Sequence, residues 1–243
     1  MTPKELKKTV AWFSAGVSSA VATKLAISQI DEIIYTHIDD QHPDTMRFIK
    51  DCEQWFGKAV TIMQSPFKTV QEVCLRFRYI NGVRGARCSQ ELKKMLRIRW
   101  EYEQQIDIKI RYVWGMDYRE KNRASRIVDT MPEQEHIFPL IDRLLSKEQA
   151  HEILSASGIK RPVMYDLGYN NNNCIGCVKG GQGYWNHIRK DFPKVFESRA
   201  KMEREIKASC INGIYLDELD PDVGRLDPPI LGECGILCEA IKL

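Results

Sequence analysis

The feature that most constrains the fold is a buried strand that runs into a loop of small residues and then into a helix. The strand is Thr9–Phe13, which is apolar enough to be buried on both faces, and the loop is Ser14–Ser19. A helix is expected over Ala20–Ile30 and a second strand over Ile33–Ile38. This alternation predicts an α/β fold with a doubly wound, mostly parallel, Rossmann-like sheet. Further elements are expected over about 43–56 (helix), 59–63 (strand), 89–104 (helix) and 110–114 (strand).

The pattern changes in the C-terminal part of the chain. From about Ser146 it consists of helices and loops, and residues 170–183 are rich in Asn, Gly and Cys. A helical stretch over about 184–208 leads into a Pro/Gly-rich end that carries the last two cysteines. We therefore expect an α/β domain over residues 1–145, with a helical, Cys-rich C-terminal region over residues 146–243 packed on it.

Composition excludes several classes of protein. Lys and Arg total 36 against 33 for Asp and Glu, and a net charge of +3 does not indicate a nucleic-acid binder. The charged N-terminus lacks a signal-peptide pattern, and no run of about 18 apolar residues occurs, so no membrane span is expected. The eight cysteines are therefore interpreted as metal ligands or redox thiols, and the expected compartment is the cytoplasm. No feature of the sequence sets an oligomeric state.

The loop Ser14–Ser19 predicts an anion-binding site. Backbone N–H groups at a helix start, together with the helix dipole, attract phosphate or sulfate, and small side chains let the oxygens approach. The serine hydroxyls add further donors. The alternative is an ordinary strand-to-helix turn with a Ser N-cap.

Five segments occur in an order typical of one known family: Ser14–Ser19, Asp39–Thr45, Arg87–Lys93, Gly115–Ala124 and Phe138–Ile141. Together they resemble the phosphoadenosine phosphosulfate (PAPS) reductase branch of the PP-loop superfamily. The resemblance covers roughly residues 9–180 and identifies residues 1–145 as the PP-loop nucleotide-binding domain. Two departures lie in the loop itself: Ser18 stands where ATP-using members carry Asp, and Ala15 where Gly is typical. The loss of that Asp disfavours metal–pyrophosphate chemistry.

The resemblance implies a bound adenine nucleotide, either PAPS, adenylyl sulfate (APS) or ATP. Asp39 is expected near the nucleoside, and Arg119 and Arg123 are expected to neutralise the anionic groups, because ligands bind beyond the carboxyl ends of parallel strands. Lys93 is a further candidate for a phosphate or sulfate contact, with a solvated helix face as the alternative. The phosphate or sulfate itself is assigned to Ser14, Gly16, Ser18 and Ser19.

The cysteines indicate a metal centre. Cys174 and Cys177 form a CxxC in a glycine-containing loop, which can turn both sulfurs toward one metal or cluster, and Cys234 and Cys238 form a second pair. Three interpretations stay open: an iron–sulfur cluster, a structural zinc site made by these four cysteines, or redox thiols without a metal. The cysteines expected to be buried small hydrophobes instead are Cys52, Cys74 and Cys210.

The spacing of Cys88 and the CxxC resembles that of the adenylyl-sulfate reductases of the family, which hold a [4Fe–4S] cluster. The resemblance implies Cys88, Cys174 and Cys177 as ligands, with Cys238 or Cys234 as the fourth, because Ser89 occupies the second position of the family's Cys-Cys pair. The alternative is a cluster with an open iron. Residues 170–173, four asparagines, suit a turn around such a centre or a simple surface turn.

The segment from Glu233 to Ile236 resembles the tail in which sulfonucleotide reductases place their nucleophile, so Cys234 is the expected catalytic residue, with a metal ligand as the alternative. The implied reaction is reduction of a small-molecule adenylyl sulfate to sulfite, with a thioredoxin-like reductant as partner. The first alternative is an ATP pyrophosphatase that adenylates tRNA or DNA for Fe–S-dependent sulfur insertion, contacting nucleic acid through residues 84–99 and 179–190. The second is a non-catalytic nucleotide-binding protein. Tyr184 and Trp185 either cover a nucleotide or pack into the core.

Overall fold

The structure is a computed structural model, and it describes residues 6–82, 85–104 and 108–225. The chain forms two compact units, each assembled from segments that are apart in the sequence. The sheet unit contains the chain up to Thr36, Pro43–Met63 and Arg97–Val163. The cysteine unit contains His37–His42, Gln64–Leu96 and the chain from Met164 onward. The division into domains at residue 145 stays a prediction.

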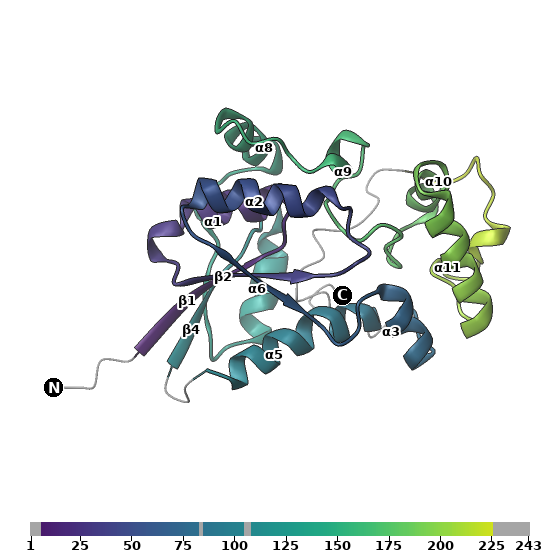
Figure 1. Cartoon of the computed structure of the whole chain (residues 1–243), viewed down its shortest axis with the longest axis horizontal. Coiled ribbons are helices and arrows are strands. Elements are labelled where there is room, and N and C mark those ends of the chain that lie inside the picture. The colour runs from purple at the N-terminus through teal and green to yellow at the C-terminus, as the bar shows by residue number, and fades with distance from the viewer. Residues whose placement is uncertain (1–5, 83–84, 105–107, 226–243) are drawn as a thin grey trace. The chain divides into compact units, whose positions relative to one another are not determined.

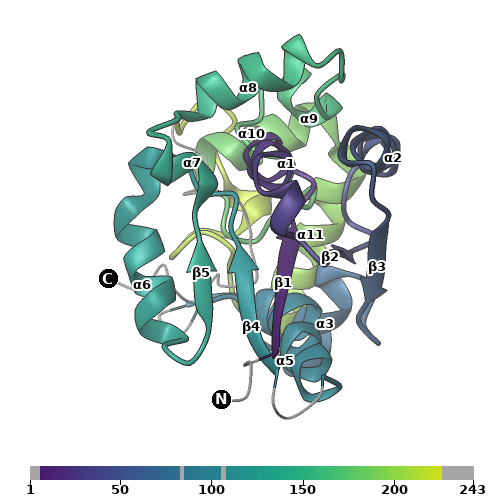
Figure 2. The same cartoon turned by 90° about the vertical axis from the view of Figure 1, so that its left-hand side faces the viewer.

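Five parallel strands form one sheet in the order β3-β2-β1-β4-β5. Figure 2 shows β1 at its centre, paired in parallel with β2 on one side and with β4 on the other. The predicted doubly wound α/β fold is confirmed, and the additional edge strand β5 pairs with β4. The strands are β1 Leu6–Phe13, β2 Glu32–His37, β3 Val60–Gln64, β4 Ile108–Val113 and β5 Glu135–Ile137.

Helices cover both faces of the sheet, as the apolar character of β1 requires. Successive residues of a strand point to opposite faces, so Trp12 and Phe13 meet different helices. Phe13 contacts Phe56 of α2 (Asp44–Phe56) edge to face, with ring centroids 5.7 Å apart. Trp12 contacts Trp100 of α5 (Met95–Tyr102) at 5.9 Å, also edge to face. In Figure 1, α2 lies above the strands and α5 below them.

Two helices differ from the expected bounds. The first helix, α1, begins earlier, at Val17, and ends at Leu25, because Gly16 supplies the extended residue that precedes it. The helix expected over 89–104 is divided by a π-helical turn at Gln90–Lys94, a rare feature that often marks a functional site. The remaining helices are α3 Val70–Phe77, α4 Arg87–Ser89, α6 Lys121–Thr130, α7 Pro139–Asp142, α8 Lys147–Ala156, α9 Val163–Asp166, α10 Gln182–Asp191 and α11 Pro193–Ile206, with 3-10 turns at Ile27–Gln29, Tyr118–Glu120 and Leu216–Glu218.

The cysteine unit is built around a core of its own. Figure 1 shows α10 and α11 side by side, and Trp185 of α10, which is completely buried, contacts the ring of Phe196 on α11. Tyr184 is also buried and meets Trp185 edge to face, with ring centroids 5.6 Å apart. Both aromatic residues therefore pack into the core, which was one of the two interpretations of this segment.

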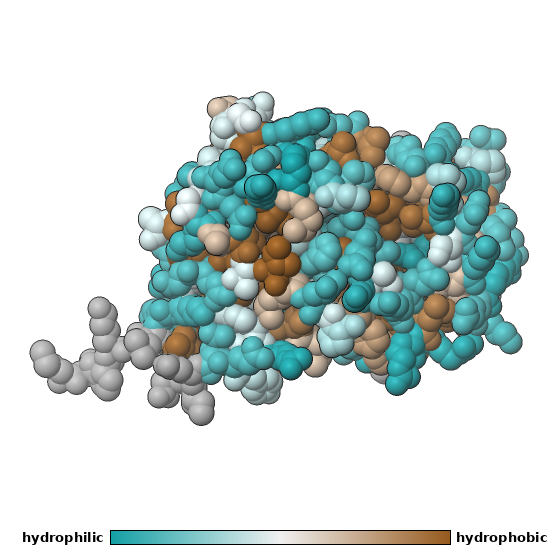
Figure 3. Space-filling view, in the orientation of Figure 1, coloured by the Kyte–Doolittle hydropathy of each residue, from teal (hydrophilic) through white to brown (hydrophobic). Residues whose placement is uncertain are grey.

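The surface is mostly hydrophilic on the face drawn in Figure 3, and apolar residues are scattered over it. Among the large apolar residues that are exposed, Ile62 lies on the edge strand β3 and Tyr102 at the end of α5. The part of the chain that the structure describes contains no helix with the length and apolar character needed to cross a membrane.

A half-buried histidine makes the stability of the sheet unit depend on pH. Burial lowers the pKa of His151, on α8, from 6.5 to about 4, and Lys147 and Arg161 lower it further by charge repulsion. Below pH 6.5 the unfolded chain therefore binds a proton that the folded chain excludes. We expect the melting temperature to fall between pH 6.5 and 4, and to fall less in His151→Gln. Equal pH dependence in both proteins, measured by calorimetry, would contradict this expectation.

Candidate functional site

The loop between β1 and α1 closes on itself through serine hydroxyls. The Ser14 N–H donates to Ser19 Oγ at 3.0 Å, and the Gly16 N–H donates to Ser14 Oγ at 3.4 Å. Gly16 is the N-cap of α1 and no side chain caps the helix, so the interpretation as a turn with a Ser N-cap is wrong. Ser18 is buried, and the first turn contains no acidic residue. An anion at this helix start therefore meets positive partial charge, with no carboxylate in the first turn of α1 itself.

The backbone is tightly packed around this loop. Ala15 has a φ of 58°, in the left-handed region that favours glycine, which is the residue typical of the PP-loop. Gly115, directly after β4, has no room for a side chain, because a Cβ there would lie 2.3 Å from Ser19 Cα. The chain changes from one side of β1 to the other between β3 and β4, so this loop lies at the topological switch point of the sheet, where ligands bind in open α/β folds.

Two arginines follow β4 in the sheet unit, and each is paired with a carboxylate. Arg119 is largely exposed and contacts Glu148 of α8 at 3.0 Å. Arg123, which is mostly buried, contacts Glu120 at 2.7 Å. An arriving anion would compete with Glu148 for Arg119 and with Glu120 for Arg123, and the exposed pair is the easier one to open because water screens it.

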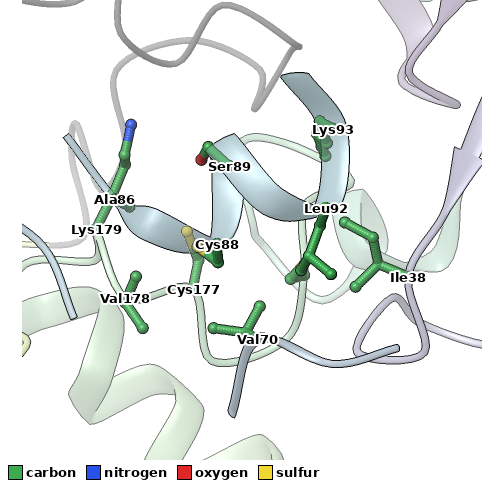
Figure 4. A pocket seen from close by; sticks show the side chains of 11 residues that line it. Ile38, Val70, Ala86, Cys88, Ser89, Leu92, Lys93, Cys177, Val178 and Lys179 are labelled. Atoms are coloured by element: carbon green, nitrogen blue, oxygen red, sulfur yellow. The ribbon is translucent and has the colours of Figure 1, made fainter. Parts of the chain in front are cut away.

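Three of the predicted metal ligands line one pocket of the cysteine unit: Cys88 from α4, and Cys174 and Cys177 from the CxxC loop. Figure 4 shows Cys88 on its helical turn and Cys177 on the loop beside it. All three are less than 10% exposed, and the pocket holds about 360 Å³ of space free of protein atoms, including its part open to solvent.

The chemistry of this pocket fits a thiolate-bound centre. Sulfur donors select zinc or iron–sulfur clusters, and Lys93 and Lys179, which line the same pocket, can offset thiolate charge. Ser89 lines it as well, at the position of the family's second cysteine. Within residues 6–82, 85–104 and 108–225, no three His, Cys, Asp or Glu side chains are already arranged around a single metal position. Binding a metal centre would therefore require at least one of the three cysteine side chains to move.

A comparison with known families covers the segments that carry both the PP-loop and the cysteine pocket. The sequence model of the phosphoadenosine phosphosulfate reductase domain matches residues 8–182. The chain belongs to the PAPS reductase family. A search of curated proteins found no match to it. The family match includes the PP-loop, Cys88 and the CxxC, whereas Cys234 and Cys238 lie beyond it and outside the described residues.

In this PAPS reductase domain, Asp39 is not one of the residues that line the cysteine pocket, although its neighbour Ile38 is. Its carboxylate is partly exposed and accepts a hydrogen bond from Gln64 Nε2 at 2.8 Å, with His37 Nε2 at 3.4 Å. Lys93 is 9% exposed and lines the pocket, so the alternative of a solvated helix face is wrong for this residue. The sequence pattern did not predict the π-helical turn on which Lys93 stands.

The four asparagines are not a simple surface turn. Asn171, Asn172 and Asn173 are buried, and two of them line a second pocket, with Tyr169 and Cys174, that holds about 250 Å³ including its open part. This pocket and the cysteine pocket share Cys174. The run therefore packs beside the CxxC loop.

Sequence reasoning missed the ion pair between Asp40 and Arg199, two residues that also hydrogen-bond to the backbone of the CxxC loop. Asp40 contacts Arg199 of α11 at 2.5 Å, and both side chains are mostly buried. The same aspartate accepts the Val70 N–H at 2.5 Å through its carboxylate and the Ile175 N–H at 2.8 Å through its carbonyl. Asp40 stands in a segment that resembles the family, but its partner is 159 residues away, and no local pattern indicates that contact.

The remaining cysteines of the described chain are buried, as expected. Cys52 and Cys74 are completely inaccessible to solvent, and Cys210 nearly so. Burial raises the pKa of the Cys74 thiol to about 12 and those of Cys52 and Cys210 further. These thiols therefore stay protonated at neutral pH, which makes them poor nucleophiles and poor metal ligands.

Proposed function

We propose that this member of the PAPS reductase family reduces an adenylyl sulfate, PAPS or APS, to sulfite. The observation that carries the proposal is the neutral PP-loop: Ser18 is buried in a first helical turn that contains no acid. Such a loop suits a phosphate or sulfate bound directly to backbone N–H groups. It does not suit a metal–pyrophosphate leaving group, which needs a carboxylate for its metal.

Different residues of the chain are assigned to the anionic group and to the nucleoside of the substrate. Ser14, Gly16, Ser18 and Ser19 hold the phosphate or sulfate, and Arg119 and Arg123 leave their carboxylate partners to neutralise it. Asp39 contacts the nucleoside, as the resemblance implies.

The chemical step is assigned to Cys234. Its thiolate attacks the sulfur atom of the adenylyl sulfate, an S–S bond forms, the S–O bond to the nucleotide breaks, and the adenosine phosphate leaves with the electron pair. A thioredoxin-like dithiol then attacks the cysteine sulfur and releases sulfite, and its second thiol closes a disulfide and restores the Cys234 thiol. The two thiols of the partner supply the two electrons that reduce sulfate to sulfite.

Cys88, Cys174 and Cys177, with Cys238 as the fourth ligand, would hold a [4Fe–4S] cluster, and zinc is the alternative metal. Their burial in one pocket with two lysines supports this assignment. A cluster there would supply a redox-active centre.

Sulfite release tests the proposal. Anaerobically purified protein is given PAPS or APS with reduced thioredoxin, and we expect sulfite from the wild type and none from Cys234→Ser of equal metal content. The measurement is sulfite per mole of protein over time, with ATP as the control nucleotide. No sulfite from either substrate, in folded and metal-loaded protein, would contradict the proposal.

One observation favours the alternative of ATP-dependent sulfur transfer to nucleic acid. Ser89 lines the cysteine pocket where a fourth cysteine would otherwise stand. A cluster with three cysteine ligands would have an iron open to sulfide. Pyrophosphate release from ATP that depends on added tRNA or DNA would select this alternative, and tight nucleotide binding without any turnover would select a non-catalytic protein.

A further inference from the structure

The two cysteines of the CxxC loop are joined through the hydroxyl of one tyrosine. Tyr184 Oη accepts a hydrogen bond from the Cys177 N–H at 2.9 Å and donates one to the Cys174 carbonyl at 3.2 Å. A single side chain on α10 therefore connects the backbone at both ends of the loop and fixes the distance between them.

The surroundings hold this tyrosine in place. Its side chain is buried, and a Cβ at Gly180 would lie 1.9 Å from the Tyr184 ring, so the ring packs directly on the backbone of the following turn. Tyr169 meets it edge to face, with ring centroids 5.8 Å apart.

The middle of the loop is fixed from a different direction. The Ile175 N–H donates to the Asp40 carbonyl at 2.8 Å, and Arg199 Nε donates to the Gly176 carbonyl at 3.4 Å. Gly176 has a φ of 69°, and a Cβ there would lie 2.6 Å from Val195, so the turn requires glycine. Backbone groups of all four loop residues are thus held by hydrogen bonds to other parts of the cysteine unit.

We propose that Tyr184 is a positioning residue that presets the spacing of the two CxxC thiolates for a metal centre. This inference rests on the proposed metal-binding role of Cys174 and Cys177. A loop held in advance loses little freedom when the metal binds. Groups that orient the metal-binding residues without binding the metal themselves typically change metal affinity by about 10- to 100-fold. We expect a loss of that size when the Tyr184 hydroxyl is removed.

The test is a Co²⁺ titration of the metal-free full chain under anaerobic conditions. Binding is measured through the thiolate-to-cobalt charge-transfer absorption. Tyr184→Phe removes the hydroxyl and keeps the ring. Tyr169→Phe is the matched control, since Tyr169 lines the same pocket but its hydroxyl bonds to Asp191 at 3.0 Å. We expect Tyr184→Phe to bind Co²⁺ about 10- to 100-fold more weakly than wild type, and Tyr169→Phe to bind like wild type.

Equal affinity in Tyr184→Phe and wild type would overturn the role of Tyr184 while leaving the metal site intact. A wild type without the charge-transfer band would instead overturn the cysteine metal site, and the positioning role with it. Amide hydrogen exchange of the wild type tests the same contact if Tyr184→Phe does not fold. The Cys177 amide should exchange slowly with solvent in the metal-free chain, and rapid exchange would contradict the hydrogen bond to Tyr184.

Discussion

Gly115→Ala is expected to weaken the binding of adenylyl sulfate by more than tenfold and to destabilise the sheet unit by about 1–3 kcal/mol. The added Cβ would lie 2.3 Å from Ser19 Cα and 2.7 Å from Ser19 N, which are backbone atoms of α1. The first turn of that helix must therefore shift, and its N–H groups move with it. Isothermal titration calorimetry with APS measures the binding, and urea unfolding measures the stability.

Gly181→Ala is the matched control for this substitution. No atom lies within 4 Å of a Cβ at Gly181, and its φ of −80° is accessible to any residue. We expect its APS affinity to equal that of wild type. Wild-type affinity in Gly115→Ala would show that APS binding does not depend on the position of this helix start. That result would remove the PP-loop from the proposed binding site.

Arg199→Met is expected to lower the free energy of unfolding of the cysteine unit by about 3–5 kcal/mol, the usual effect of breaking one partner of a buried ion pair. The substitution leaves the mostly buried carboxylate of Asp40 without its cation and removes the hydrogen bond to the Gly176 carbonyl. Because both contacts support the CxxC loop, metal content should fall as well. Urea unfolding monitored by tryptophan fluorescence and metal analysis are the two measurements.

Arg204→Met provides the comparison on the same helix, α11. Arg204 contacts Asp217 at 2.6 Å, but both side chains are exposed, and exposed ion pairs contribute little to stability. Its unfolding midpoint and metal content should stay close to those of wild type. If the two variants lose stability equally, the Asp40–Arg199 pair has no special role in holding the loop.

The fold was predictable because its signals are local. The apolar strand before Ser14 and the small residues after it predict a strand–loop–helix unit, and alternation along the chain predicts a parallel sheet. Several elements escaped this reasoning, among them the helices α3 and α6, the strand β5 and the π-helical turn. β5 is three residues long, too short for a periodic pattern, and the π-helical turn at Gln90–Lys94 leaves no mark in the spacing of apolar residues.

The candidate site was predictable only in its reactive residues. The spacing of the cysteines indicated a metal centre, and the structure places Cys88, Cys174 and Cys177 in the lining of one pocket. The groups that hold the loop were not predictable, because Asp40 and Arg199 meet by tertiary packing. The sequence predicts only that Tyr184 covers a nucleotide or packs into the core, because its hydrogen bonds to both cysteines depend on the packing of α10.

The most direct test of the central claim is the mass of the intact chain after it is mixed with an adenylyl sulfate in the absence of any reductant. Reduction through a cysteine nucleophile predicts that the chain gains one SO₃ group, that peptide mapping places it on Cys234, and that thioredoxin removes it as sulfite. A chain that binds the nucleotide but keeps its original mass would contradict the proposed reaction.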